Sequence, residues 1–207
     1  MEAEHCISPW RCQPKHGPAF RMPLIDFKNR RERGTAARAL YGQAVAQARR
    51  PVFYARLGVP DTLDGRFELI SLHVFLLLRR LSKEGSGAEK LAQAIFDLMF
   101  ADMDQSLREL GVGDLAVGRR VKAMVKALYG RIAAYEEGLA GDDGVLAAAL
   151  ARNLFGTAAA RAPDLAALCA YVRREAAALA RRPLAVLCRG QADFGALTEA
   201  ELGQITF

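Results

Sequence analysis

Three carboxylates stand close together in the sequence at Asp97, Asp102 and Asp104. Carboxylates at such spacing can hold a divalent metal ion or share the roles of general acid and general base. At about 100° per helical residue, Asp97 and Asp104 lie within about 20° of each other, but Asp102 points about 140° away. Asp97 and Asp104 are also about 10 Å apart along the helix axis. The pattern therefore favours an exposed acidic face, with Asp104 and Arg108 paired one turn apart, over a metal centre.

His73 is the one histidine beyond the first 23 residues. A catalytic histidine needs a nucleophile or a carboxylate beside it, and its own helical face offers neither within one turn. We expect His73 to lie in the core and to bond a neighbouring helix. The glycines at 111, 113 and 118 lack the Gly-Lys-Ser/Thr ending of a phosphate loop and follow a predicted helix, not a strand. The sequence therefore predicts no cofactor and no bound metal.

Arg119, Lys122 and Lys126 form a basic stripe at helical spacing. Such a stripe is usually a solvated helix face, and it also suits RNA, a lipid surface or an acidic protein. The whole chain has a net charge of +6, from 29 Lys+Arg against 23 Asp+Glu. Because no aromatic side chains alternate with the stripe's cations, sequence-specific nucleic-acid binding is not predicted.

Helices must position these side chains, because apolar residues recur every three or four positions along most of the chain. The chain has 207 residues, 52% of them hydrophobic, enough for one domain with a full core. We predict an all-α fold, a compact single-domain bundle of about six to seven helices. The expected helical segments are 32–49, 52–57, 66–84, 88–110, 115–139, 143–154, 164–181 and 184–188.

The two ends of the chain lack this helical period. Residues 1–23 are expected to form a disordered tail, residues 24–195 the helical domain, and residues 196–207 an irregular C-terminal tail. The longest apolar run, Leu69–Leu78, is interrupted by Ser71 and His73 and is too short to span a bilayer. Residues 1–21 do not show the apolar run of a signal peptide, so a cytoplasmic location is predicted.

Three segments carry a resemblance to a known family: YGQAVAQARRPVFY at 41–54, VPDTLDGRFELISLHVFLLLRRL at 59–81, and FDLMFADMDQSLRELGVGDLAVGRRVKAMVKALYGRIAAY at 96–135. They resemble the ubiquinol–cytochrome c chaperone family over residues 41–140, and residues 141–195 match more loosely. The alanine- and arginine-rich composition suggests a bacterial member. The resemblance implies an assembly chaperone of respiratory complex III with no enzymatic activity. It also implies binding of newly made cytochrome b, together with a small helical partner protein near the ribosomal exit.

The resemblance also identifies candidate partner-binding residues, because a fold alone does not need so many charges at fixed places. Together with the basic stripe, these candidates are Asp61, Asp64, Arg66, Phe67, Glu68, His73, Asp97, Asp102, Asp104, Arg108, Glu109, Gly111, Gly113, Asp114, Arg119, Lys122 and Lys126. A binding surface and a buried ionic network are equally compatible with these charges. We expect the helix start at Asp64–Glu68 and the helix pair joined at Gly111–Asp114 to meet at any functional surface.

Two other functions stay open at this point. One is a metal-dependent enzyme that uses Asp97, Asp102 and Asp104. The other is a regulatory helical module that meets the ribosome or RNA through the basic stripe. A chaperone of a membrane protein could also sit at the periphery of the inner face of the cytoplasmic membrane, without a transmembrane segment of its own.

Overall fold

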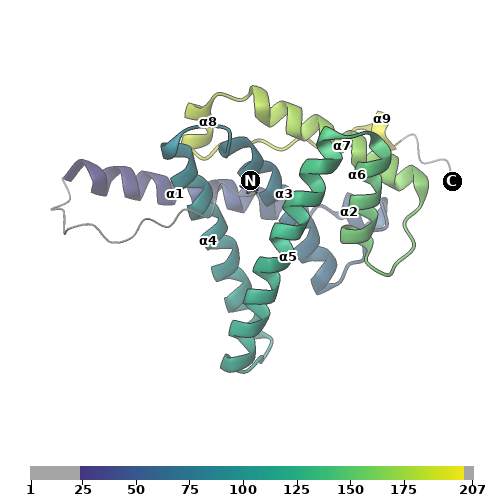
Figure 1. Ribbon diagram of the computed structural model, residues 1–207, viewed down its shortest axis with the longest axis horizontal. Helices are drawn as coiled ribbons and strands as arrows, with labels where there is room; N and C mark the ends of the chain where they lie inside the picture. Colours follow the sequence, from purple (N-terminus) through teal and green to yellow (C-terminus); the bar gives the residue numbers. More distant parts are fainter. Residues whose placement is uncertain (1–23, 203–207) are drawn as a thin grey trace, which may run out of the picture.

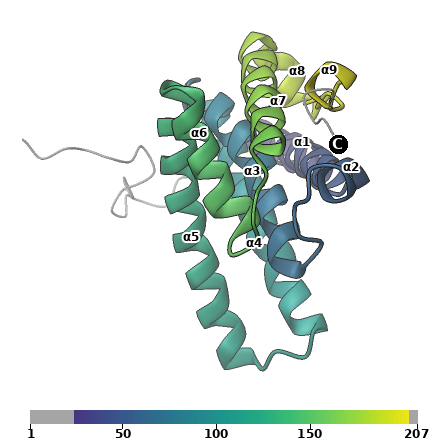
Figure 2. The ribbon, with the colours of Figure 1, turned by 90° about the vertical axis from the view of Figure 1, so that its right-hand side faces the viewer.

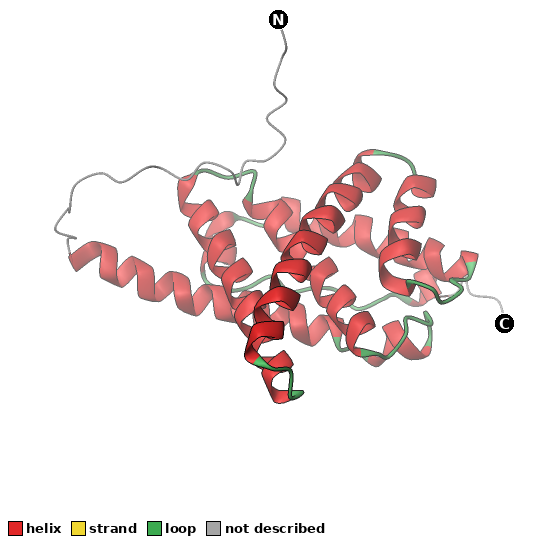
Figure 3. Cartoon of the chain, turned by 60° about the horizontal axis from the view of Figure 1, so that its bottom comes forward, coloured by secondary structure: helices red, strands yellow, loops and turns green. Residues whose placement is uncertain are grey.

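The chain folds into helices with no β-strand over residues 24–202, the part that this computed structural model describes (Figure 3). Within that range six helices have eight residues or more: α1 (Leu24–Ala48), α3 (Leu63–Leu81), α4 (Ser86–Glu109), α5 (Asp114–Ala140), α6 (Asp143–Leu150) and α7 (Ala162–Arg181). The shorter elements are α2 (Pro51–Ala55), the π-helix η1 (Ala151–Phe155), α8 (Leu184–Cys188) and α9 (Glu199–Leu202). The predicted all-α fold is confirmed.

Helix α3 forms the centre of the bundle and packs against α1, α4, α5 and α7. Its residues are buried on almost every side, as its nearly continuous apolar sequence predicts. The helix begins where the Thr62 hydroxyl accepts a 3.1 Å hydrogen bond from the Gly65 backbone N–H. Gly65 is required there, because a Cβ would lie 2.0 Å from the Pro60 carbonyl oxygen. The start of α3 is therefore fixed in place beside its neighbours.

Helices α4 and α5 form an antiparallel hairpin whose closed end projects beyond the other helices (Figures 1 and 2). The turn between them contains Gly111 at φ +78°, a left-handed conformation that glycine adopts at low cost. Along α5, the seam against its neighbours includes the buried side chains of Val117, Leu128 and Tyr135. At the other end of α5, Gly138 lets α6 cross closely, since a Cβ there would lie 2.8 Å from the Leu146 Cα.

The segment after α8, residues 190–198, crosses α1 and α7, and we call it the C-terminal strap. Gln43 of α1 donates from Nε2 to the Gly190 carbonyl at 2.5 Å, and its Oε1 accepts from the backbone N–H of Ala192 at 2.9 Å. One turn later, Gln47 donates to the Gly195 carbonyl at 2.7 Å. Two side chains of one helix therefore hold the strap by its backbone.

Two expectations about the ends of elements were wrong. Residues 196–207 were expected to be irregular, but Glu199–Leu202 form α9, because Thr198 and Glu201 bond each other's backbone N–H in a capping box. The rest of that expected tail, residues 203–207, lies outside the described residues. Helix α1 begins at Leu24 instead of residue 32. The expected disordered tail at 1–23 lies outside the described residues. Among the described helices, none is long and apolar enough to cross a membrane.

Candidate functional site

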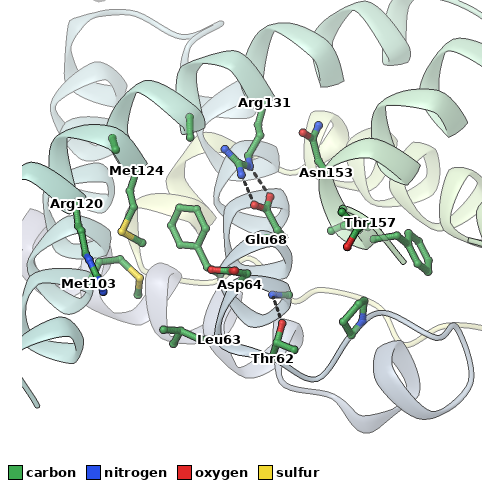
Figure 4. Close-up of a pocket in the computed structure, with 18 of the residues that line it drawn as sticks. Thr62, Leu63, Asp64, Glu68, Met103, Arg120, Met124, Arg131, Asn153 and Thr157 are labelled. Atoms are coloured by element: carbon green, nitrogen blue, oxygen red, sulfur yellow. Dashed lines mark hydrogen bonds and ion pairs between the residues drawn. The ribbon is translucent and has the colours of Figure 1, made fainter. Parts of the chain in front are cut away.

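A large groove opens between the start of α3, the second half of α4, the first half of α5, and η1 with the loop after it (Figure 4). Its volume is about 1020 Å³, at the upper end of what small-molecule sites offer. The apolar part of its lining consists chiefly of Leu63, Phe67, Met103, Leu107, Leu110, Met124, Leu154 and Phe155. Methionines adapt to different apolar partners, because their side chains are unbranched and flexible. The lining therefore suits an apolar segment of variable shape.

A buried ion pair forms one wall of the groove. Arg131 of α5 donates through Nε and Nη2 to the two carboxylate oxygens of Glu68 on α3. The same guanidinium lies over the ring of Phe67, with its Cζ 5.5 Å from the ring centroid. Burial raises the pKa of the Glu68 carboxyl, and the neighbouring Arg131 guanidinium opposes that rise. The pair fixes α3 against α5 and leaves the Phe67 ring facing the groove.

The rim of the groove is apolar in one part and basic in another. Leu63 and Leu110 are 56% and 61% exposed, and both line the groove. Arg120 on α5 and Arg152 on η1 also line the groove, and neither forms an ion pair within residues 24–202. Asp64 is the exposed acid among the lining residues. An occupant of the groove would therefore meet apolar walls and two free guanidinium groups.

The π-helix η1 supplies another wall of the groove. The sequence predicts one α-helix over residues 143–154, but α6 ends at Leu150 and the next turn widens into η1. Gly156, at φ +57°, ends that turn. The widened turn contributes Asn153 and Leu154 to the lining (Figure 4). Single π-turns within helices frequently occur at functional sites.

Of the candidates named from the sequence, Asp64, Phe67 and Glu68 line the groove. The start of α3 therefore forms part of the groove. The turn at Gly111–Asp114 does not line the groove, but the preceding residue, Leu110, does. Asp114 lies in the first turn of α5, where it pairs with Arg108.

His73 lies in the core, away from the groove. Its Nδ1 donates to the Leu69 carbonyl at 2.7 Å, because a carbonyl can only accept, and its Nε2 accepts from the Tyr171 hydroxyl at 2.8 Å. Gln47 donates in turn to the same hydroxyl oxygen at 3.0 Å. Burial lowers the pKa of His73 to about 4, so the imidazole is neutral at physiological pH. The hydrogen bond of His73 to Tyr171 links α3 to α7, and the buried side chain cannot contact a partner protein.

The three aspartates of α4 serve three different contacts. Asp97 accepts from Gln93 at 2.7 Å on the exposed face. Asp102 accepts from the Tyr41 hydroxyl of α1, and Asp104 accepts from Arg108, both at 2.6 Å. Over residues 24–202, His, Cys, Asp and Glu side chains form no group of three or more that could hold a metal ion. The aspartates therefore do not converge as a metal-dependent site would require.

The other candidates lie on the surface outside the groove. Asp61 and Arg66 pair with each other at 2.7 Å, and both are more than half exposed. Glu109 accepts from Gln105 at 2.8 Å within α4. The remaining candidates are Gly111 and Gly113 in the hairpin turn, and Arg119, Lys122 and Lys126 on the outward face of α5.

Sequence reasoning missed most of the groove. Met103, Leu107 and Met124 have the three- or four-residue spacing of core positions, so periodicity alone predicts that they are covered by neighbouring helices. Arg120, Met124, Ala127 and Arg131 follow one another at steps of three or four residues, which predicts one face of α5. That face mixes arginines with small and apolar residues, and this mixture is the signal that could have identified it.

A profile of the family described as ubiquinol-cytochrome C chaperone matches residues 55–194. The chain belongs to this family. The matched segment contains every element that lines the groove, from α3 to η1 and the loop after it. The resemblance inferred from the three sequence segments is therefore confirmed.

Relatives of this chaperone-family chain are found in animals and bacteria. The ubiquinol-cytochrome-c reductase complex assembly factor 1 of Xenopus laevis is 31% identical over 140 residues, which cover 68% of this chain and 70% of that protein. The mouse assembly factor 1 is also 31% identical over 140 residues, and the match spans 48% of its length. A crystal structure of the Cbp3 homolog from Brucella abortus superposes with a TM-score of 0.74 at 36% identity, covering 84% of this chain and 98% of that one.

Proposed function

We propose that this protein is an assembly chaperone for ubiquinol–cytochrome c reductase and that it holds newly made cytochrome b through the groove beside the α4–α5 hairpin. Membership of the chaperone family supports the general role. The relatives from Xenopus and mouse carry the words assembly factor in their names. The single observation that carries the binding site is the apolar groove of about 1020 Å³ with Met103 and Met124 in its walls.

The chemistry of the groove suits a segment of an unassembled membrane protein. Such a protein exposes apolar helices of about 20 residues, which aggregate in water unless they are covered. A groove lined by leucine, methionine and phenylalanine covers part of such a helix without requiring one sequence. Arg120 and Arg152 at the rim can donate hydrogen bonds to the polar ends of the segment, such as helix carbonyls or acidic side chains. The proposed activity is therefore binding and release, with no covalent step.

Surfaces outside the groove remain available for other assembly factors. A small helical partner protein and the ribosome would bring the nascent client to the groove, and the exposed face of α4 is free to meet them. The chaperone would act in the cytoplasm or at the periphery of the inner face of the membrane. Client binding at either location needs no metal-dependent chemistry at Asp97, Asp102 and Asp104.

Site-specific photo-crosslinking in the native cell tests the groove directly. A photoreactive residue at Ala123, which lines the groove, should crosslink to cytochrome b. The same residue at Ala133 is the matched control, because Ala133 is an exposed alanine on the outward face of the same helix. Equal crosslinking from both positions would count against the groove. Normal levels of assembled complex III in a strain without the gene would count against the function itself.

A further inference from the structure

A stripe of exposed side chains runs along α5 on a face that the groove does not use. It consists of Leu115, Arg119, Lys122, Lys126 and Tyr129, and we call it the outer stripe. At about 100° per residue, these five side chains fall within a sector about 80° wide. At about 1.5 Å per residue, the stripe is about 21 Å long. Its side chains therefore form one continuous surface.

The three cations of the outer stripe have no protein counter-charge. Within the described residues, Arg119, Lys122 and Lys126 form no ion pair. By contrast, Arg108 on the neighbouring α4 is bound by both Asp104 and Asp114. Cations that are not neutralised by the protein create a positive potential that attracts an anionic surface. The outer stripe is therefore electrostatically matched to an extended negative partner.

Apolar side chains accompany these cations. Leu115 is 88% exposed, and Tyr129 at the other end of the stripe is 43% exposed. Leu110, 61% exposed, stands across the hairpin turn from Leu115. Cations interleaved with exposed leucine and tyrosine are typical of helices that lie in a lipid interface, where leucine enters the acyl boundary and tyrosine stays at headgroup level. The phosphate backbone of RNA would leave Leu115 in water, so these observations favour lipid over RNA.

We propose that the outer stripe docks the α4–α5 hairpin onto the surface of an anionic phospholipid bilayer, with Leu115 inserted to the boundary between headgroups and acyl chains. The hairpin end projects beyond the other helices, so a flat surface can approach it (Figures 1 and 2). The groove-lining Ala123 and Ala127 lie about 80° and 120° around α5 from Leu115. The docked protein would therefore hold the groove beside the bilayer, open to a segment that leaves it. Lipid docking is independent of client binding and would stand if the groove bound another client.

Vesicle sedimentation with the purified full chain tests the proposal. We expect the protein to bind vesicles of phosphatidylcholine with phosphatidylglycerol at least about tenfold more strongly than vesicles of phosphatidylcholine alone, and to release them in high salt. Each cation near an anionic surface strengthens binding about fivefold. The variant Arg119→Glu/Lys122→Glu/Lys126→Glu should therefore bind at least about 100-fold more weakly. Leu115→Gln, which keeps the charge, should weaken binding about fivefold.

A charge-matched control separates the outer stripe from the net charge of the protein. Lys83→Glu/Arg181→Glu/Arg189→Glu makes the same change in charge at exposed positions near the α3–α4 turn and the ends of α7 and α8, remote from the hairpin tip (Figure 1). This control should bind anionic vesicles within about threefold of the wild type, and circular dichroism should show all variants equally helical. Equal losses in the two triple variants, or binding of single-stranded RNA in place of vesicles, would overturn the proposal.

Discussion

The Tyr41 hydroxyl of α1 donates a 2.6 Å hydrogen bond to the Asp102 carboxylate of α4. Burial and the adjacent carboxylate both raise the pKa of Tyr41, so its hydroxyl stays protonated and able to donate. One of the three aspartates that could have done chemistry is thereby assigned to the contact between two helices. The Asp102 carboxylate therefore stabilises the packing of α1 against α4 and is not directed toward a metal site.

Removing either partner of this bond should destabilise the fold. Tyr41→Phe removes the donor, and Asp102→Asn leaves only a neutral acceptor. Each change should lower the free energy of unfolding by about 1–2 kcal/mol, because a hydrogen bond to a charged group is lost. In a urea double-mutant cycle, the two changes should show a coupling of about 1 kcal/mol. Asp97→Asn is the control and should change stability by less than about 0.5 kcal/mol, since Asp97 is exposed. Additive effects of the two substitutions would show that the bond contributes nothing.

Breaking the ion pair in the groove wall should cost more than breaking the Tyr41–Asp102 bond. Glu68→Ala leaves the largely buried Arg131 side chain, 17% exposed, without its counter-ion, and we expect a loss of about 3–5 kcal/mol in the free energy of unfolding. The double variant Glu68→Met/Arg131→Met removes both charges and should be more stable than Glu68→Ala alone. The free energies of unfolding of the single and the double variant can be measured from their denaturant midpoints, provided that the slope of the free energy against denaturant is unchanged. A double variant less stable than the single one would contradict this account.

Filling the groove should abolish client binding without unfolding the protein. Ala123→Trp places an indole among the lining residues, whereas Ala133→Trp places it on the outward face of the same helix. We expect the first variant to bind a cytochrome b segment at least about tenfold more weakly and the second to bind it like the wild type. Co-purification of each variant with the segment measures the effect. Equal binding by both variants would rule out the groove as the client site.

Acid should destabilise the protein through His73. The pKa of His73 is about 4 in the fold against 6.5 ordinarily, so the folded state favours the neutral imidazole. The stability that the neutral His73 imidazole contributes is fully present above pH 6.5 and is lost as the pH falls toward 4. The loss between pH 7 and pH 4 should be about 3 kcal/mol. Comparing unfolding of the wild type and His73→Gln across this range isolates the contribution, and parallel curves would contradict it.

The main helices were predictable from the sequence because each buries one repeating face. The stripes over 66–84, 88–110 and 115–139 correspond to α3, α4 and α5 within a few residues. The short helix α9 was missed although its signal was present. Thr198 followed three residues later by Glu201 is the sequence pattern of a capping box. Such a box can start a short helix even where no apolar stripe is present.

The groove could not be predicted in the same way. Met103 and Met124 have the spacing of core residues, and spacing alone does not tell whether a neighbour covers a face. Glu68 and Arg131 are 63 residues apart, so only the fold brings them together. The sequence over 151–155 gave no indication that a helix would widen into η1. Contacts between distant segments and uncovered faces depend on tertiary packing, which periodicity does not describe.

The C-terminal strap has a consequence for the order of folding. Gln43 bonds backbone groups that lie 147–150 residues later in the chain, and Gln47 bonds one that lies 148 residues later. Contacts across such separations cost the most chain entropy and form slowly. The α4–α5 hairpin, by contrast, closes over a short turn. During synthesis, α4 and α5 can therefore pack together before residues 190–195 are available to bond α1. Closure of the C-terminal strap is expected to be the last step to native structure.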